Sequence, residues 1–457
     1  MRKIDLHTLV DEARFNRFHL LILAWCALII IFDGYDLAVV GIALPFIMKD
    51  LGVAPANAGF MVSSALFGMM FGAILLGTIA DRVGRRWTMS ICIVLFSLFT
   101  AAAGLTRDPI VFGVLRFIAG VGIGGVMPNV VAQMTEYSPK RTRATLVTLM
   151  FSGYAVGGIV AAVLGKGLID TYGWQSVFFA AAAPIILVPL IFISMPESMP
   201  FLLAKGRTHE LQRIVRRLDA GWQPSGGDQF VVPVEDKVDS APIRQLFAEG
   251  RGFSTVMFWI AFFTCLFMVY ALSSWLTKLM AAAGFSLGSA LTFVLVLNAG
   301  AIVGSVGGGW LADRFHIKYV LASMFALAAV SITLLGFKMP TPALFAVVAL
   351  AGASTIGTQI VANAYTGQFY PMAVRGTGLG WALGIGRAGA IIAPILIGIL
   401  VGMNLPLQQN FMAIAIPALL GMVAVLLIDH GKSAAHRVDP RDGDEKVSLG
   451  QAMATGN

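Results

Sequence analysis

The sequence predicts an all-α integral membrane protein with twelve transmembrane helices in two pseudo-symmetric six-helix bundles. Three observations predict it. Of the 457 residues 58% are hydrophobic and only 12% are charged, long apolar segments follow one another with short polar breaks, and two loop sequences recur at one spacing. A spanning helix needs roughly 20 mostly apolar residues, whereas a membrane β-barrel shows alternating segments of about ten. The continuous apolar runs therefore indicate helices.

Twelve segments have the required length and divide six and six around a long linker. We expect the spans at 18–42, 57–80, 88–106, 110–134, 145–170, 174–194, 253–280, 288–311, 318–337, 342–365, 376–402 and 410–429. The chain then consists of an N-terminal segment (1–17), an N-terminal bundle (18–194), a linker (195–252), a C-terminal bundle (253–429) and a polar tail (430–457). The linker stretch "ELQRIVRRLDAG" predicts an amphipathic helix on the membrane surface, and the tail is expected to be disordered.

Lys and Arg residues are concentrated in the predicted loops on the side of both termini. Short cytoplasmic loops carry this excess, so we expect both termini in the cytoplasm. The net charge of +8 then reflects topology, and no basic run with interleaved aromatic residues indicates a nucleic-acid partner. Three cysteines and six histidines show no metal-ligand spacing. We expect no metal, no cofactor and no enzyme activity.

An internal repeat connects the two halves. "GTIADRVGRR" (77–86) corresponds to "GWLADRFHIK" (309–318) and pairs Asp81 with Asp313, a shift of 313 − 81 = 232. "EYSPKRTRAT" (136–145) corresponds to "QFYPMAVRGT" (368–377) and pairs Arg143 with Arg375 at the same shift. Two separate loops with one offset indicate a duplicated six-helix unit.

These loops also carry a family resemblance. The Gly-x-x-x-Asp-Arg-x-Gly-Arg-Arg pattern at 77–86 and "RFIAGVGIGG" at 116–125 resemble signatures of the major facilitator superfamily. "DGYD" at 33–36 resembles the aromatic acid:proton symporter family, and 15–430 is similar to its benzoate permeases. The resemblance implies the major facilitator fold, a monomer in a bacterial inner membrane, and import of an aromatic carboxylate with protons. The second loop lacks the Gly-Arg-Arg ending, so its contacts are expected to be weaker.

Two acids lie inside the first predicted span. Intramembrane acids are costly, by at least about 2.5 kcal/mol when ionised, and normally face a bundle interior or an aqueous cavity. At i and i+3, Asp33 and Asp36 share one helix face, and two close carboxylates disfavour double ionisation. We therefore predict a proton-coupling site. The alternative is that one acid, Asp36 more than Asp33, caps or ion-pairs with another helix.

Two cations lie inside later spans. Arg116 and Arg387 are candidates to bind a substrate carboxylate, because a guanidinium group suits bidentate contact. For Arg116 an internal ion pair or proton relay is the open alternative. Either cation needs an acid partner when the site is empty, and the two aspartates are available.

Further polar and aromatic residues are candidates to line the site. Aromatic rings would suit an aromatic substrate, although aromatics in spans also face lipid or the interface. Two i,i+4 amide pairs indicate polar helix faces, with interhelical packing bonds as the alternative. These candidates are Tyr35, Tyr154, Phe267, Tyr270, Trp275, Trp381, Asn129, Gln133, Gln359 and Asn363.

The loop motifs are expected to gate rather than to bind. Their Arg residues could pair with acids such as Glu136 across the seam between the bundles, forming when that side closes and breaking when it opens. The alternative is topology alone. The gating candidates are Asp81, Arg82, Arg85, Arg86, Glu136, Arg143, Asp313, Arg314 and Arg375.

The sequence thus predicts a proton-coupled symporter that imports an aromatic carboxylate, benzoate or a hydroxybenzoate, by alternating access. Two alternatives stay open. A proton-coupled exporter of organic anions or drugs would also use intramembrane acids, since these do not set direction. A membrane sensor of aromatic acids is disfavoured because the chain has no sizeable soluble output domain.

Overall fold

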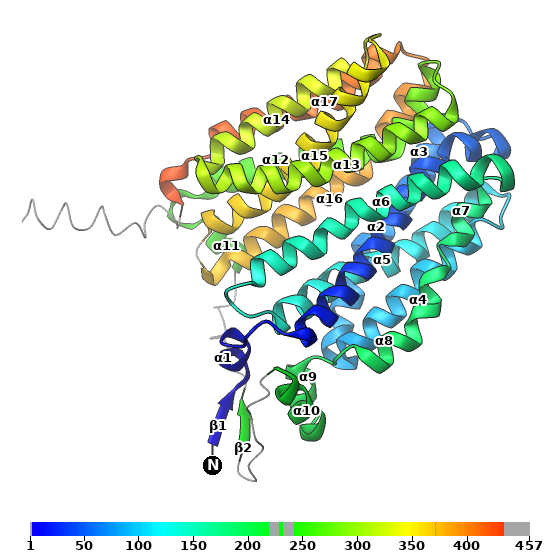
Figure 1. Ribbon diagram of the computed structural model, residues 1–457. Helices are drawn as coiled ribbons and strands as arrows, with labels where there is room; N and C mark the ends of the chain where they lie inside the picture. Colours follow the sequence, from blue (N-terminus) through cyan, green and yellow to red (C-terminus); the bar gives the residue numbers. More distant parts are fainter. Residues whose placement is uncertain (1, 219–227, 232–241, 371, 434–457) are drawn as a thin grey trace, which may run out of the picture.

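The computed structural model describes residues 2–218, 228–231, 242–370 and 372–433. The predicted tail beyond Ser433 and most of the linker between α10 and α11 lie outside these residues. Figure 1 shows the two halves of the chain as two helical bundles lying side by side, the blue-to-green half below and the yellow-to-red half above.

The described chain contains twelve helices that are long and apolar enough to span a membrane. The N-terminal six are α2 Arg17–Leu51, α3 Pro55–Val83, α4 Arg85–Ala103, α5 Pro109–Tyr137, α6 Arg143–Tyr172 and a sixth in three pieces, α7 Gln175–Ala180, η1 Ala183–Leu187 and α8 Val188–Ser194. The C-terminal six are α12 Gly252–Ala282, α13 Leu287–Arg314, α14 Ile317–Leu334, α15 Thr341–Phe369, α16 Met372–Gly402 and α17 Leu407–Leu427. The predicted twelve-helix membrane fold is confirmed.

Local sequence explains where these helices begin and end. Asn16 caps α2, because its side chain accepts hydrogen bonds from the backbone N–H groups of Phe18 and His19 at 2.9 and 3.3 Å. Asp108 caps α5 in the same way, with Pro109 in the first turn. Between α3 and α4 the chain turns at Gly84, whose φ of 103° suits glycine.

The repeat is visible in helix boundaries and in close contacts. α5 and α15 both begin and end 232 residues apart (341 − 109 and 369 − 137). A Cβ on Gly68 would lie 2.0 Å from the Phe117 carbonyl oxygen, and a Cβ on Gly300 would lie 2.1 Å from that of Ala349. Both glycines let two helices of one bundle touch through their backbones, and both partners differ by the same 232 residues. The second bundle repeats the packing of the first.

One predicted boundary was wrong by more than two turns. The first span was expected to end at 42, but α2 continues to Leu51 through Pro45, and Leu44 and Ile47 are buried. The continuation puts the two acids in the middle of the helix. The span predicted at 174–194 is confirmed as Gln175–Ser194. Its helix is irregular, because Pro184 and Pro189 each lack the N–H that would bond to the preceding turn.

Small elements cover the ends of the bundles on the side where α2 begins and α17 ends, which we call the terminal side. These are β1 Arg2–Asp5, α1 Leu6–Asp11, α9 Met199–Ala204, α10 Thr208–Leu218, β2 Asp228–Val231, α11 Pro242–Leu246, η2 Ala248–Gly250 and η3 His430–Lys432. β1 pairs in parallel with β2, and Figure 1 shows both beyond the bundle ends. The amphipathic helix expected on the membrane surface is α10. Its apolar residues Leu211, Ile214 and Val215 are buried in the core of the N-terminal half, so protein covers this face.

The two bundles touch on the side opposite the terminal side. There the Ser63 hydroxyl donates to the Ile391 carbonyl oxygen at 2.7 Å, and a Cβ on Gly59 would lie 2.4 Å from the Pro394 carbonyl oxygen. About two turns nearer the terminal side, the residues of α3 and α16 that follow on these faces are not in contact. Met70 is 38% exposed, and a Cβ on the exposed Gly384 would have no neighbour within 4 Å. The printed contacts between α3 and α16 therefore hold the seam closed on the side opposite the terminal side, and Met70 and Gly384 make no such contact nearer the terminal side.

Candidate functional site

Asp33 and Asp36 lie in the middle of α2 and are both fully buried. Neither Asp33 carboxyl oxygen has a hydrogen-bond partner in the described residues. Asp33 interacts electrostatically with Asp36 and with Arg387 of α16. An ionised carboxylate buried without donors is costly. Among the acids that the structure describes, Asp33 is the buried one with no hydrogen-bond partner on either carboxyl oxygen.

Asp36 is arranged differently, because an ion pair joins it to α5. A guanidinium nitrogen of Arg116 lies 2.9 Å from one Asp36 carboxylate oxygen and 3.1 Å from the other. The Thr100 hydroxyl of α4 donates to the same carboxylate and accepts from Arg116 at 2.6 Å. The cluster is an internal ion pair, the alternative that the sequence left open for both Asp36 and Arg116.

Arg387 lies halfway along α16, is half-buried, and has no carboxylate within salt-bridge distance among the described residues. Its guanidinium donates to the Tyr270 hydroxyl of α12 at 3.4 Å and approaches the Met69 sulfur of α3 at 3.9 Å. Tyr154 of α6 lies beside Tyr270 and interacts electrostatically with it and with Arg387. Arg387 is thus a cation held by neutral groups at the seam between the bundles.

A cavity lies beside this cluster and between the bundles. α2, α3, α5 and α6 line it from the first half, and α12, α13 and α15 line it from the second. Most lining side chains are apolar. The polar ones are Arg116, Tyr154, Tyr270, Ser273, Ser274 and Asn298. An apolar hollow with a few convergent polar groups and a cation nearby is suited to a small amphipathic anion.

The structure places most of the other aromatic candidates away from the cavity. Tyr35 is buried and donates to the Val177 carbonyl oxygen at 2.7 Å. The Trp275 ring is fully buried and donates to the Pro394 carbonyl oxygen at 3.0 Å. Trp381 is 41% exposed and stacks on Trp259. Phe267 is buried in the core. Of the predicted aromatics, only Tyr154 and Tyr270 border the cavity.

The predicted amide pairs do not border the cavity either. Asn129 donates to the Gly125 carbonyl oxygen of its own helix at 2.7 Å, and Gln133 donates to the Pro196 carbonyl oxygen at 2.8 Å. Gln359 and Asn363 are half-buried on α15. Sequence reasoning missed Asn298, a single amide within the apolar run "LVLNAGA", which has no polar partner in sequence to draw attention to it.

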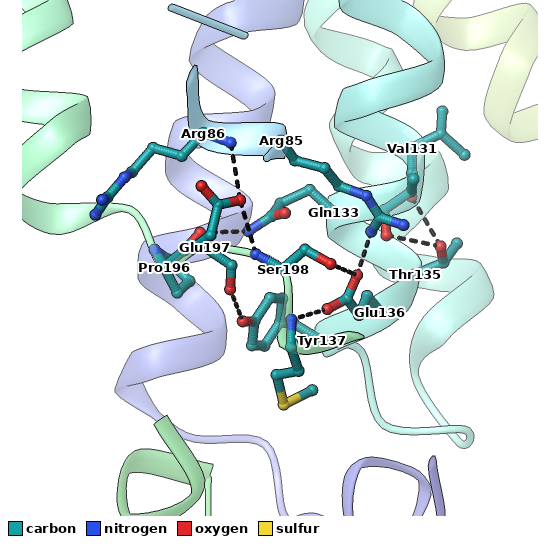
Figure 2. A network of polar contacts seen from close by, with 12 residues as sticks. Arg85, Arg86, Val131, Gln133, Thr135, Glu136, Tyr137, Pro196, Glu197 and Ser198 are labelled. Carbon is teal, nitrogen blue, oxygen red and sulfur yellow. Dashed lines mark hydrogen bonds and ion pairs between the residues drawn. The ribbon is translucent and has the colours of Figure 1, made fainter. Parts of the chain in front are cut away.

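A second polar cluster lies on the terminal side and is shown in Figure 2. Arg85, at the start of α4, forms an ion pair with Glu136, near the end of α5. Glu136 also accepts hydrogen bonds from the Ser198 hydroxyl at 3.0 Å and from the Met199 N–H group. The backbone N–H of Arg86 donates to Glu197 at 3.2 Å. These contacts tie α4, α5 and the start of α9 together.

This cluster corrects the predicted pairing of Glu136. The pair was expected across the seam, but Arg85 and Glu136 belong to the same bundle, because the end of α5 lies beside the start of α4. Arg143 likewise pairs with Asp11 of α1, within the N-terminal half. Arg82 is exposed and Arg314 lies over the Trp310 ring. The side chains of Asp81, Asp313 and Arg375 lie outside the described residues.

No group that could hold a metal ion occurs in the part of the chain that the structure describes. The three cysteines are free and buried.

Twelve spanning helices in two repeated bundles, with a mostly apolar cavity at their seam, define a membrane transporter fold. The pattern of the Major Facilitator Superfamily matches residues 26–337 and, in a second match, 293–453. The chain belongs to the Major Facilitator Superfamily, and this identity makes it a transporter and not an enzyme.

Named relatives cover almost the whole chain. A benzoate transport protein of Acinetobacter baylyi is 45% identical over 434 residues, which are 94% of this chain and 93% of the relative. A gallate transporter of Pseudomonas putida is 34% identical over 94% of this chain and 96% of the relative. A 4-hydroxybenzoate transporter of A. baylyi is also 34% identical, over 93% and 94%. The predicted resemblance to aromatic acid transporters is confirmed.

Solved structures show the same fold at low identity. A bacterial homologue of the human lysosomal transporter Spinster has a TM-score of 0.71 at 18% identity, with 91% of this chain and 97% of that chain covered. The inward-open xylose transporter XylE of E. coli has a TM-score of 0.67 at 18% identity, with 90% and 95% covered.

Proposed function

We propose that the chain imports an aromatic carboxylate, benzoate or a hydroxybenzoate, together with protons by alternating access in a bacterial inner membrane. The proposal rests on two groups that interact electrostatically without forming a salt bridge. Among the described residues, the buried Asp33 carboxyl has no hydrogen-bond partner, and Arg387 has no carboxylate within salt-bridge distance. The relatives' substrates support the aromatic acid, and the mostly apolar cavity suits a ring.

The charge arrangement supports coupling. Asp33 and a substrate carboxylate would both interact with Arg387, and two anions close together in a poorly hydrated site are unfavourable. A proton on Asp33 removes one of them and leaves Arg387 to the substrate. Binding of proton and substrate anion is thereby linked, each favouring the other. Tyr154 and Tyr270 would complete the carboxylate site as hydroxyl donors.

Other predicted roles fit around this centre. Asp36 and Arg116 hold α2, α4 and α5 in place and position Asp33 one turn away. The cluster of Arg85 and Glu136 would gate indirectly, by making the N-terminal bundle move as one body. With both termini in the cytoplasm, as the distribution of Lys and Arg predicts, the terminal side of the seam faces the cytoplasm. We propose that one chain, as a monomer, performs the cycle.

The test is uptake of radiolabelled benzoate by proteoliposomes with an imposed inward proton gradient. We expect accumulation by the wild type, its loss without the gradient, and its loss in Asp33→Asn. Asp170→Asn, an exposed acid at the end of α6, is the matched control and should behave as the wild type.

The same vesicles separate the alternatives. Unchanged accumulation in Asp33→Asn would move coupling to another residue. Gradient-driven efflux of preloaded benzoate without uptake would indicate an exporter. Binding without flux in either direction would indicate a sensor.

A further inference from the structure

Asn298 lies on α13 at the cavity wall, directly across the seam from Gly158 of α6. A Cβ placed on Gly158 would lie 2.4 Å from the Asn298 side-chain oxygen and 2.8 Å from its nitrogen. The absence of a side chain at residue 158 therefore makes the space that the amide occupies. Asn298 comes from one bundle and Gly158 from the other, so the amide meets whatever the two bundles enclose.

The hydrogen bonds of Asn298 leave one group free. Its Nδ2 donates to the Val294 carbonyl oxygen of its own helix at 2.9 Å, which fixes the side chain. Its carbonyl oxygen accepts no hydrogen bond from the described residues. A carbonyl oxygen with open lone pairs binds a hydroxyl donor, whereas it gains nothing from a carboxylate.

The rest of the cavity gives this acceptor a distinct position. Tyr154 and Tyr270 belong to the cluster around Arg387, and Arg116 is held by Asp36. Apolar side chains such as Val62, Val269 and Leu297 make up most of the remaining wall. A ring whose carboxylate is bound by Arg387 would be in an apolar surrounding, with the Asn298 oxygen as an acceptor for a ring substituent.

We propose that Asn298 is a specificity-determining residue, which accepts the hydrogen bond of a ring hydroxyl and so admits monohydroxybenzoates beside benzoate. The inference rests on the proposed function for the identity of the carboxylate site. Asn298 is half-buried, so a bound ring would cover its oxygen. A polar site discriminates for a hydroxyl because its own group is then left unpaired when the hydroxyl is missing.

Calorimetric binding to the purified full-length protein in detergent tests this without requiring transport. The probes are benzoate, 3-hydroxybenzoate and 4-hydroxybenzoate. In Asn298→Leu, which is similar in size, we expect the Kd for at least one hydroxybenzoate to rise about three- to tenfold relative to that for benzoate, the loss expected for one neutral hydrogen bond.

Asn129→Leu is the matched control, because Asn129 makes the same kind of bond to its own helix, to Gly125, and does not border the cavity. In Asn129→Leu, the ratio of the Kd for each hydroxybenzoate to the Kd for benzoate should equal that of the wild type. Gly158→Ala is the second variant if Asn298→Leu does not fold. Its methyl group displaces the amide and should shift the ratio in the same direction.

An unchanged ratio for both isomers in a folded variant at either position overturns the inference, as does the absence of hydroxybenzoate binding to the wild type. Failure of the proposed function looks different. If the wild type binds these acids and Asn298→Leu shifts the ratio, but vesicles show no proton-driven uptake, the inference stands and the transport proposal fails.

Discussion

The ion pair of Asp36 and Arg116 makes a sharp prediction for stability. Both side chains are 1% exposed, and their charged atoms are 2.9 Å apart. Removal of one partner leaves the other charge buried, which costs about 3–5 kcal/mol of unfolding free energy. We therefore expect Arg116→Gln alone to be strongly destabilising, because among the described residues only the Thr100 side chain then stays bonded to the Asp36 carboxylate.

A double-mutant cycle measures how much of this cost belongs to the pair. Asp36→Asn with Arg116→Gln replaces two charges by two amides, so the double variant should be more stable than Arg116→Gln by about 2 kcal/mol or more. The assay is reversible unfolding in mixed micelles with a denaturing detergent, followed by circular dichroism.

The chain offers a matched control for the cycle. Asp11 and Arg143 form an ion pair whose side chains are 34% and 35% exposed, and the same cycle there should give a coupling of about 1 kcal/mol or less, because water screens both charges. If the buried cycle is additive, or if its coupling does not exceed the control, the pair does not hold the helices together as argued.

Three further predictions concern the site, the terminal side and the seam. Arg387→Lys keeps the charge but loses the planar fork, so the Kd for benzoate should rise about tenfold in calorimetry. Glu136→Gln removes the charge that Arg85 binds and should expose the segment after α8 to proteolysis; protection equal to the wild type would contradict this. A Cβ on Gly41 would lie 2.0 Å from the Ser273 carbonyl oxygen, so Gly41→Ala should separate α2 from α12. A cysteine introduced near this contact should then react faster with a thiol label.

Much of the fold was readable from the sequence because the membrane imposes it. Backbone groups in lipid must be satisfied within a helix, so apolar length alone located the spans. It also located several ends closely, such as those of the spans predicted at 288–311 and 376–402, but it did not locate the end of the first span. α2 passes Pro45 because its last turns are buried by neighbouring helices, and neighbours cannot be read from one segment.

The site was readable only in part. Charged residues in an apolar span stand out, so Asp33, Asp36, Arg116 and Arg387 were found. Tyr35 was expected at the cavity because an aromatic ring would suit an aromatic substrate, but its side chain is buried elsewhere and its hydroxyl donates to the Val177 carbonyl oxygen. Asn298 gave no such signal, because the space that its side chain occupies is left by Gly158, which lies on a helix far away in the sequence.

The two arginines show why position in three dimensions decides a role that residue type leaves open. Arg116 is paired with a carboxylate that belongs to the protein, so a substrate anion would have to displace Asp36 and break the Thr100 contacts as well. Among the described residues, the hydrogen-bond partners of Arg387 are neutral groups at 3.4 and 3.9 Å, so an anion can approach it without breaking a salt bridge. In the proposed cycle Asp33 and the substrate share this one available cation. Coupling then needs no dedicated relay, because the proton decides which of the two carboxylates Arg387 stabilises.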